Sequence, residues 1–161
     1  MTSTPAKTLS TLNSYFDELT IGDRFVTRSR TVTEADIVLF SGLSGDYHPL
    51  HTDEEFAARG PFGARVAQGA LTLSLATGLE FSLIGSAEES RIVAFYGMDR
   101  VRFVRPVLIG DTIHVEGEVT ALEEKDEARG VVTMHEEVKN QRGETVVALD
   151  KRLLHKRRQA D

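Results

Sequence analysis

The longest run of helical periodicity lies in the middle of the chain, at about 68–83. Small and apolar residues recur there at i, i+3 and i+4 spacing: Ala70, Leu71, Ser74, Leu75, Gly78, Leu79 and Ser82. Because Leu73, Ala76 and Leu83 extend the apolar surface around the cylinder, we expect a helix buried on most sides. Its first turn contains no obvious capping side chain, which leaves the first backbone N–H groups free to meet another group.

From residue 91 onwards the helical period gives way to segments rich in strand-forming residues. We predict strands at about 91–104, 111–123, 129–140 and 145–155, with an earlier strand at 24–32. About five mostly antiparallel strands and one long central helix indicate the α+β class, in which a curved sheet wraps around the helix and buries it.

Two shorter helices are predicted before the long one. Thr33 and Asp36 form a weak capping box for a helix at 34–42, which we expect to end at Gly42. A second short helix at 54–58 is capped by Thr52 or Asp53. Residues 1–14 are interpreted as a flexible arm, and 15–158 as a single domain.

Composition and charge narrow the functional classes. The chain has 161 residues, a net charge of −6 and no cysteine, which argues against general nucleic-acid binding and excludes thiolate catalysis. It contains no apolar run of about 18 residues and no signal peptide, so we expect a cytoplasmic protein without membrane contact. The basic end at 155–158 is interpreted as a charged terminal tail.

The strongest candidate chemistry lies at 45–51, where one carboxylate and two imidazoles fall within seven residues. Pro49 restricts its own backbone and that of His48, and Gly45 permits a turn. Asp46 and His51 are therefore candidates for an acid/base pair presented by a stiff loop. The alternative interpretation is that Asp46 caps a turn and His51 is a packed polar residue.

The sequence also offers a candidate backbone donor and candidate metal ligands. Gly69 would begin the long helix, where its N–H and the positive dipole end can stabilise an oxyanion; a glycine needed for a turn or packing is the alternative. A metal site made by Asp46, His48 and His51 is disfavoured because the spacing matches no known ligand motif. No phosphate-binding glycine loop appears, and Ser41 and Ser44 do not form a nucleophile motif.

Three arginines alternate with apolar residues in the segment after the long helix: Arg100, Arg102 and Arg105. Such a row can meet the phosphates of an anionic ligand, although a solvated strand face is the commoner explanation.

The chain resembles the MaoC-like dehydratases and (R)-specific enoyl-CoA hydratases. The resemblance covers about 15–155 and is carried by Ser44-Gly45-Asp46-Tyr47-His48-Pro49-Leu50-His51, by Val66-Ala67-Gln68-Gly69-Ala70-Leu71, and by Arg102-Phe103-Val104-Arg105-Pro106-Val107 with Ile109-Gly110-Asp111-Thr112. It implies a hot dog fold and a homodimer or dimer of dimers with acyl-thioester sites at the subunit interface. No cofactor is implied beyond the coenzyme A or acyl carrier protein that carries the substrate.

The resemblance also implies roles for individual residues. Asp46 and His51 would activate water and deliver a proton, and the Gly69 amide would polarise the thioester carbonyl. We expect substrate contacts from His48, Gln68, Thr77 and Arg102. His48 stands where the family commonly has asparagine, and Gln68 where it often has histidine, so the chemistry is retained while substrate choice is left open.

We therefore predict a hydro-lyase that reversibly hydrates 2-enoyl thioesters to (R)-3-hydroxyacyl thioesters. The alternatives are an acyl-CoA thioesterase and a non-catalytic acyl-thioester-binding subunit that supports another hot dog chain. The sequence does not determine acyl-chain length.

Overall fold

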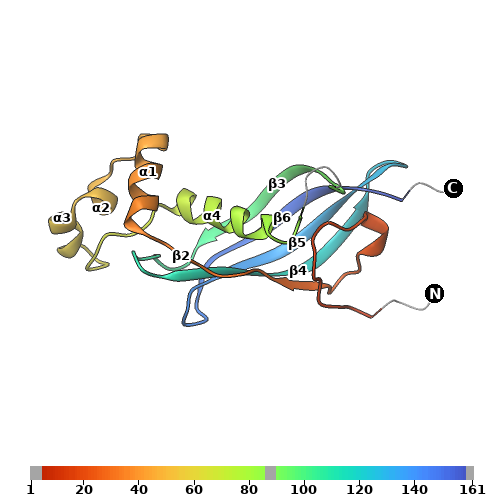
Figure 1. Cartoon of the computed structure of the whole chain (residues 1–161), viewed down its shortest axis with the longest axis horizontal. Coiled ribbons are helices and arrows are strands. Elements are labelled where there is room, and N and C mark those ends of the chain that lie inside the picture. Colours follow the sequence, from red (N-terminus) through yellow and green to blue (C-terminus); the bar gives the residue numbers. More distant parts are fainter. Residues whose placement is uncertain (1–4, 86–89, 159–161) are drawn as a thin grey trace.

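A long helix lies against one face of an antiparallel sheet in the computed structural model, which describes residues 5–85 and 90–158 (Figure 1). The elements in chain order are a 3₁₀ turn at Phe16–Glu18, β1 Arg24–Val26, β2 Arg30–Thr31, α1 Glu34–Ser44, α2 Pro49–Thr52, α3 Glu54–Ala58, α4 Gly69–Phe81, β3 Ile92–Phe103, β4 Thr112–Glu124, β5 Arg129–Lys139 and β6 Thr145–Lys156. The α+β class predicted from the sequence is confirmed.

The sheet has the order β1-β4-β5-β6-β3, with β2 also paired to β4. All its pairings are antiparallel, and β3 forms one edge because it pairs only with β6. Helices α1 to α3 project beyond one end of the sheet, whereas both chain ends lie towards the other end (Figure 1). This arrangement places the N-terminus of α4 beside the projecting helices.

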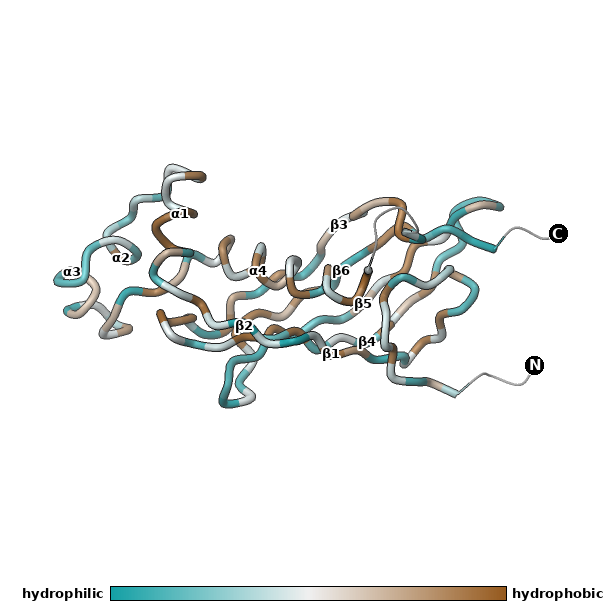
Figure 2. Tube along the Cα trace, viewed as in Figure 1, coloured by the Kyte–Doolittle hydropathy of each residue, from teal (hydrophilic) through white to brown (hydrophobic). Residues whose placement is uncertain are grey.

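The core fills the space between α4 and the inner sheet face. Leu71, Ala76 and Leu79 of α4 pack in the same buried cluster as strand residues such as Val132 and Leu149. Hydrophobic colour accordingly follows α4 and the strands behind it, while α3 is mostly hydrophilic (Figure 2). Burial of this apolar surface is the main contribution to stability, at roughly 25 cal/mol per Å².

A cluster of ionisable groups interrupts this apolar core. The Lys151 ammonium on β6 is ion-paired with Glu80 on α4 and lies 4.0 Å from Glu136 on β5. All three side chains are buried. Two carboxylates around one ammonium leave an unbalanced negative charge, so burial and the neighbouring Glu80 carboxylate raise the pKa of Glu136 well above its ordinary value.

Two of the shorter predicted elements differ in extent from the structure. The strand predicted at 24–32 is divided because the Thr27 hydroxyl, instead of a ladder carbonyl, accepts the Val115 N–H at 2.9 Å. The prediction that the first helix ends at Gly42 is wrong: α1 continues to Ser44, and Gly45 adopts the left-handed conformation at φ 77°. A helix end of this kind favours glycine, which has no Cβ to clash.

The two ends of the described chain are held against the body of the protein. In the segment predicted as an arm, Leu12 is buried and its N–H donates to Leu83 O at 2.9 Å; residues 1–4 lie outside the described residues. The interpretation of 155–158 as a tail is wrong for its first part, since His155 is buried in β6. Arg157 is ion-paired with Asp17. Among the described residues, no helix is long and apolar enough to cross a membrane.

Candidate active site

The loop after α1 folds as its proline and glycine predict. Gly45 ends α1, His48 has the extended conformation expected before proline (φ −55°, ψ 133°), and Pro49 begins the short helix α2. The His48 ring stabilises this turn, because its Nδ1 accepts the Leu50 N–H at 3.1 Å. His51 is thereby carried on the last turn of α2, directed back towards Asp46.

Asp46 and His51 form the pair that the sequence predicts. Oδ2 of Asp46 lies 3.7 Å from Nε2 of His51. The Asp46 side chain is 45% exposed and that of His51 only 13%, so the carboxylate is hydrated while the imidazole lines the protein interior. The other carboxylate oxygen, Oδ1, accepts the His48 N–H at 3.2 Å and orients the group.

The second nitrogen of His51 determines its tautomer. Nδ1 lies 2.7 Å from the carbonyl oxygen of Val66, which can only accept a hydrogen bond. Nδ1 therefore carries a proton, and in the neutral ring the lone pair is on Nε2, the atom that faces Asp46. This tautomer places on Nε2 the lone pair that a general base requires.

His51 opens onto a cavity of about 510 Å³ between α4 and the segment after β3. Its wall is mostly apolar and includes His51, Phe62, Val66, Ala67, Gly69, Ala70, Thr72, Phe103, Val104, Arg105, Pro106, Val107 and Val147. A volume of this size suits a small organic ligand or the acyl end of a larger one.

The N-terminus of α4 forms another part of the wall. Gly69 is its first residue, and within the described part of the chain no acceptor takes the Gly69 N–H. Gln68 makes no capping hydrogen bond, as the sequence predicts. The free amide and the positive end of the helix dipole therefore face the same cavity as His51.

The structure places Asp46 beside His51, and it places His51 and Gly69 on the wall of one cavity that Asp46 does not line. The other predicted site residues lie elsewhere. Gln68 is buried and donates from Nε2 to Ser41 Oγ at 2.9 Å, while its Oε1 has no hydrogen-bond partner among the described residues. Thr77 donates to Leu73 O on its own helix, and neither Thr77 nor Arg102 lines the cavity. The roles of these residues in binding stay predictions.

Several lining residues were not singled out by sequence reasoning. Phe62, Thr72 and Phe103 lie on the turn after α3, on α4 and on β3 and carry no chemical motif, so only the fold places them around one cavity. Arg105 was recognised only as one of three arginines in a row. Its distinguishing signal is the following Pro106, which is disfavoured within a strand and indicates that Arg105 lies outside β3, as the end of β3 at Phe103 shows.

No metal centre is formed by the part of the chain that the structure describes: no group of three or more His, Cys, Asp or Glu side chains is arranged to hold an ion. The Nδ1 of His48 is occupied by the Leu50 N–H, which removes it from the proposed alternative of a site shared with His51.

Comparison with known proteins identifies relatives over most of this region. Residues 17–141 match the family model described as a MaoC-like domain. Protein MaoC of Klebsiella aerogenes is 46% identical over 101 residues, 63% of this chain but 29% of that protein. The (R)-specific enoyl-CoA hydratase of Rhodospirillum rubrum is 34% identical over 108 residues, 67% of this chain and 71% of that enzyme.

Solved structures confirm the predicted hot dog fold. A protein from Archaeoglobus fulgius described as a monoamine oxidase regulatory protein is 42% identical, with a TM-score of 0.85 over 97% of this chain and 100% of its own. A Mycobacterium tuberculosis protein with a double hot dog fold shares the fold at 19% identity and a TM-score of 0.77, over 91% of this chain and 45% of its own. The chain thus belongs to the family of MaoC-like domains.

Proposed function

We propose that this protein is a hydro-lyase that reversibly adds water to 2-enoyl thioesters and forms (R)-3-hydroxyacyl thioesters. One observation carries the proposal: the Asp46 carboxylate lies 3.7 Å from the imidazole of His51, and His51 lines an apolar cavity together with Gly69, the first residue of α4. The names of relatives agree with it, since an (R)-specific enoyl-CoA hydratase and a 3-hydroxybutyryl-CoA dehydratase are among them.

The proposed reaction uses a water molecule between Asp46 and His51. Their 3.7 Å separation is too long for a strong direct hydrogen bond, and both atoms can hold the same water. Nε2 of His51 takes a proton as the water oxygen bonds to C3 of the enoyl group, and the imidazolium then gives that proton to C2. Asp46 orients the water and stabilises the imidazolium, so the atoms of one water are added across the double bond.

Negative charge develops on the thioester oxygen during this addition. The Gly69 N–H is the donor proposed to stabilise that charge. Loss of a single such donor costs about 10²–10³ in kcat in enzymes that depend on one. The acyl group would occupy the apolar part of the cavity, with no cofactor needed beyond the carrier of the thioester.

The proposal is tested with Asp46→Asn and His51→Gln, assayed by loss of the conjugated-thioester absorbance of crotonyl-CoA. Each variant is expected to lose about 10²–10⁴-fold in kcat, the usual contribution of general acid–base catalysis. His114→Gln and Asp126→Asn are matched controls, since both residues lie in the sheet region away from the cavity. Near-wild-type rates in both site variants would overturn the proposal.

The same assay separates the alternatives. A thioesterase would release a free thiol, which a thiol reagent detects and hydration does not produce. A non-catalytic subunit would bind the thioester without either change. Release of thiol that depends on His51 would replace the hydratase proposal with a thioesterase. A wild-type protein that binds the thioester but leaves it unchanged would replace it with a non-catalytic subunit.

A homodimer is proposed for the assembly, with the free edge of the sheet as the contact. Within the described residues β3 pairs with β6 on one side and with no strand on the other. The residues Phe95, Tyr96 and Phe103 of this strand are each 45–56% exposed. An apolar edge strand is a template for pairing with another chain, and a second copy would cover it.

A further inference from the structure

We propose that Arg105, supported by Arg142, binds a phosphate of the thioester's carrier where the substrate leaves the cavity. The inference rests on the proposed function, because it takes the ligand to be an acyl thioester on a phosphorylated pantetheine arm. It assigns the direction in which that arm leaves the site and the residue that recognises it.

Two cavities meet at one short segment of chain. Arg105 and Pro106 line the 510 Å³ cavity that contains His51, and the same two residues line a second cavity of about 250 Å³. The second cavity extends to the turn between β5 and β6, where Asn140, Arg142 and Glu144 form its other wall. A ligand too long for the first cavity can therefore continue past Arg105 into the second.

The Arg105 guanidinium is available for a ligand. The residue is exposed, and no hydrogen bond or ion pair involves its side chain within the described residues. Its backbone, in contrast, is fixed because the Arg105 N–H and the Val104 N–H both donate to Val146 O. Arginine with a free planar fork on a fixed backbone suits bidentate binding of phosphate.

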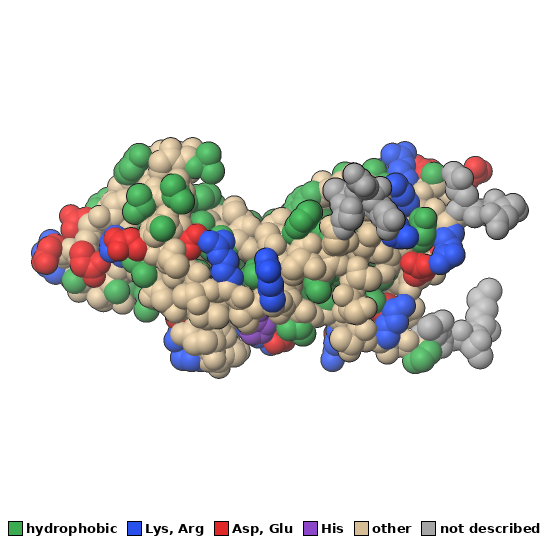
Figure 3. Space-filling model, viewed as in Figure 1, with side chains coloured by type: hydrophobic (Ala, Val, Ile, Leu, Met, Phe, Trp, Pro, Cys, Tyr) green, Lys and Arg blue, Asp and Glu red, His purple; other side chains and the backbone are tan. Residues whose placement is uncertain are grey.

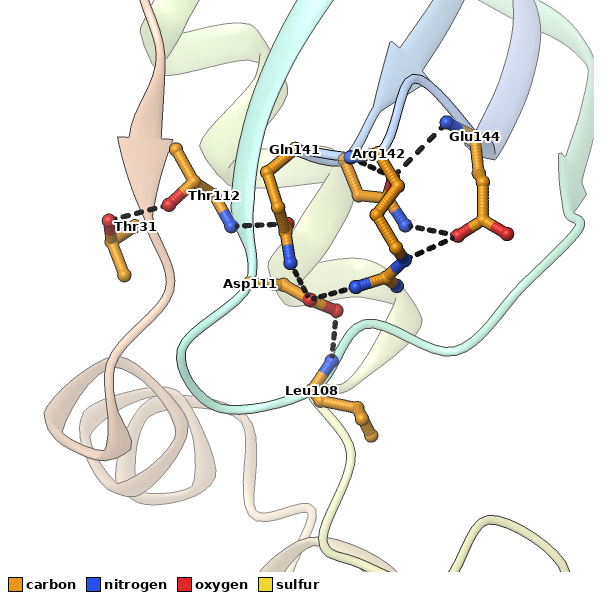
Figure 4. Close-up of polar contacts among 8 residues, drawn as sticks. Thr31, Leu108, Asp111, Thr112, Gln141, Arg142 and Glu144 are labelled. Atoms are coloured by element: carbon orange, nitrogen blue, oxygen red, sulfur yellow. Dashed lines mark hydrogen bonds and ion pairs between the residues drawn. The ribbon is translucent and has the colours of Figure 1, made fainter.

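Arg142 is held rigidly at the other wall of the second cavity. Its Nε donates to Glu144 at 2.8 Å and its Nη1 lies 3.4 Å from the buried carboxylate of Asp111 (Figure 4). Gln141 also donates to Asp111 at 2.7 Å, which joins this turn to the start of β4 (Figure 4). Arg142 is thus partly neutralised and positioned. Arg105 is close enough to lower the pKa of the Glu144 carboxyl, which Asn140 and Arg142 lower more, but it forms no ion pair within the described residues and keeps its guanidinium for a ligand.

The opposite side of the active-site cavity would repel a phosphate. Acidic side chains gather on the projecting end formed by α1 to α3 (Figure 3), where Asp53, Glu54 and Glu55 are exposed. The arginines there are already paired: Arg65 binds Glu34 and Glu54, each at 2.7 Å. An anionic carrier arm is therefore favoured on the Arg105 side of the mouth.

The test measures binding of free coenzyme A and kcat/KM for crotonyl thioesters of coenzyme A, 4′-phosphopantetheine and pantetheine. Arg105→Ala is expected to weaken coenzyme A binding and to lower kcat/KM for phosphate-bearing thioesters by about 10- to 100-fold, the usual value of a charge-assisted hydrogen bond. The pantetheine thioester, which has no phosphate, should react as with the wild type. Arg105→Lys should recover part of the loss through its point charge.

Arg28→Ala is the matched control, since Arg28 is an exposed arginine that makes no ion pair within the described residues and lies outside both cavities. If Arg105→Ala lowers kcat/KM for both the coenzyme A and the 4′-phosphopantetheine thioesters, the result supports recognition of the 4′-phosphate. If it lowers kcat/KM for the coenzyme A thioester alone, the result supports recognition of the nucleotide phosphates. An equal loss for the pantetheine thioester, or unchanged coenzyme A binding in both Arg105→Ala and Arg105→Gln, would overturn the inference.

Failure of the proposed function would look different. If the wild type hydrates none of the thioesters, the hydratase proposal fails, but coenzyme A binding still tests the phosphate site on its own. Thermal unfolding of each variant, which we expect to match the wild type because Arg105 is exposed, separates binding from folding.

Discussion

The ring of Phe103 lies directly over the α-carbon of Gly69. A methyl group built on Gly69 would be 2.9 Å from Cε1 of Phe103, closer than side chains pack. Residue 69 is therefore a glycine because of a neighbour on β3, not because of its own backbone conformation: its φ is not in the left-handed region. The contact joins the proposed oxyanion donor to the edge strand of the sheet.

This contact predicts that Gly69→Ala displaces the Phe103 ring and shifts the start of α4. Because a misplacement of about 1 Å can cost about 10²-fold in rate, kcat/KM for a short enoyl-CoA should fall by up to that factor. The double variant Gly69→Ala/Phe103→Leu should recover part of the activity. An unchanged rate in Gly69→Ala would show that the amide and the ring do not need this spacing.

The hydrogen bond between Gln68 and Ser41 connects α1 to the start of α4 within the protein interior. Ser41→Ala would leave the Gln68 amide without a partner, so we expect a loss of about 1–3 kcal/mol in the free energy of unfolding, measured with urea. Ser41→Ala/Gln68→Met, which removes both polar groups, should lose less than the sum of the single variants. Additive losses would contradict this coupling.

The stability of the folded protein is expected to depend strongly on Lys151, the cation of the buried ion cluster. Lys151→Met would leave Glu80 and Glu136 buried without a positive charge, so we expect a loss of roughly 3–5 kcal/mol in the free energy of unfolding. Lys139, which is ion-paired with Glu116 at 2.7 Å on the sheet surface, provides the control, and Lys139→Met should cost about 1 kcal/mol or less.

The same cluster predicts that stability falls as pH rises. Burial, followed by the Glu80 carboxylate, raises the pKa of Glu136 well above 4.5, so the folded state keeps a proton that the unfolded chain releases. The stability that this proton contributes to the folded state is fully present below about pH 4.5. It is lost as pH rises through the folded-state pKa of Glu136. Glu136→Gln should flatten the decline in Tm on the alkaline side; an unchanged slope would exclude Glu136 as its source.

His155 predicts the opposite slope on the acid side. Burial lowers the pKa of its ring below 6.5, and its Nδ1 donates to the carbonyl of Ser14 at 2.9 Å. Protonation therefore favours the unfolded chain, and the stability present above pH 6.5 is lost as pH falls. His155→Gln should weaken this acid-side loss in a pH series of Tm measurements, whereas His114→Gln, on a partly exposed ring, serves as the control.

The edge strand predicts the assembly state. Phe95→Lys/Tyr96→Lys would place two charges on β3, and we expect the dimer to give way to a monomer in sedimentation velocity experiments. Charge substitution of Leu39, a still more exposed apolar residue on α1, should leave the sedimentation coefficient unchanged. A wild-type protein that sediments as a monomer would remove β3 as a dimer contact.

The amino-acid sequence by itself determined the features that depend on near neighbours. The capping box of Thr33 and Asp36, the extended His48 before Pro49, the uncapped start of α4 and the approach of Asp46 to His51 all follow from interactions within a few residues. Periodicity likewise sufficed for the long helix, and richness in strand-forming residues for the four long strands, because each of these elements extends over more than ten residues.

Only the tertiary structure decided the contacts between distant segments. The Val66 carbonyl that fixes the His51 tautomer, the Phe103 ring against Gly69, and the burial of Lys151 between two glutamates each join elements that no local pattern relates. Arg102 and Arg105 belong to one basic segment of the sequence, yet only Arg105, which lies beyond the end of β3 at Phe103, lines the cavity. Packing of α4 on the sheet determines these relationships, since it fixes which side chains meet across the core.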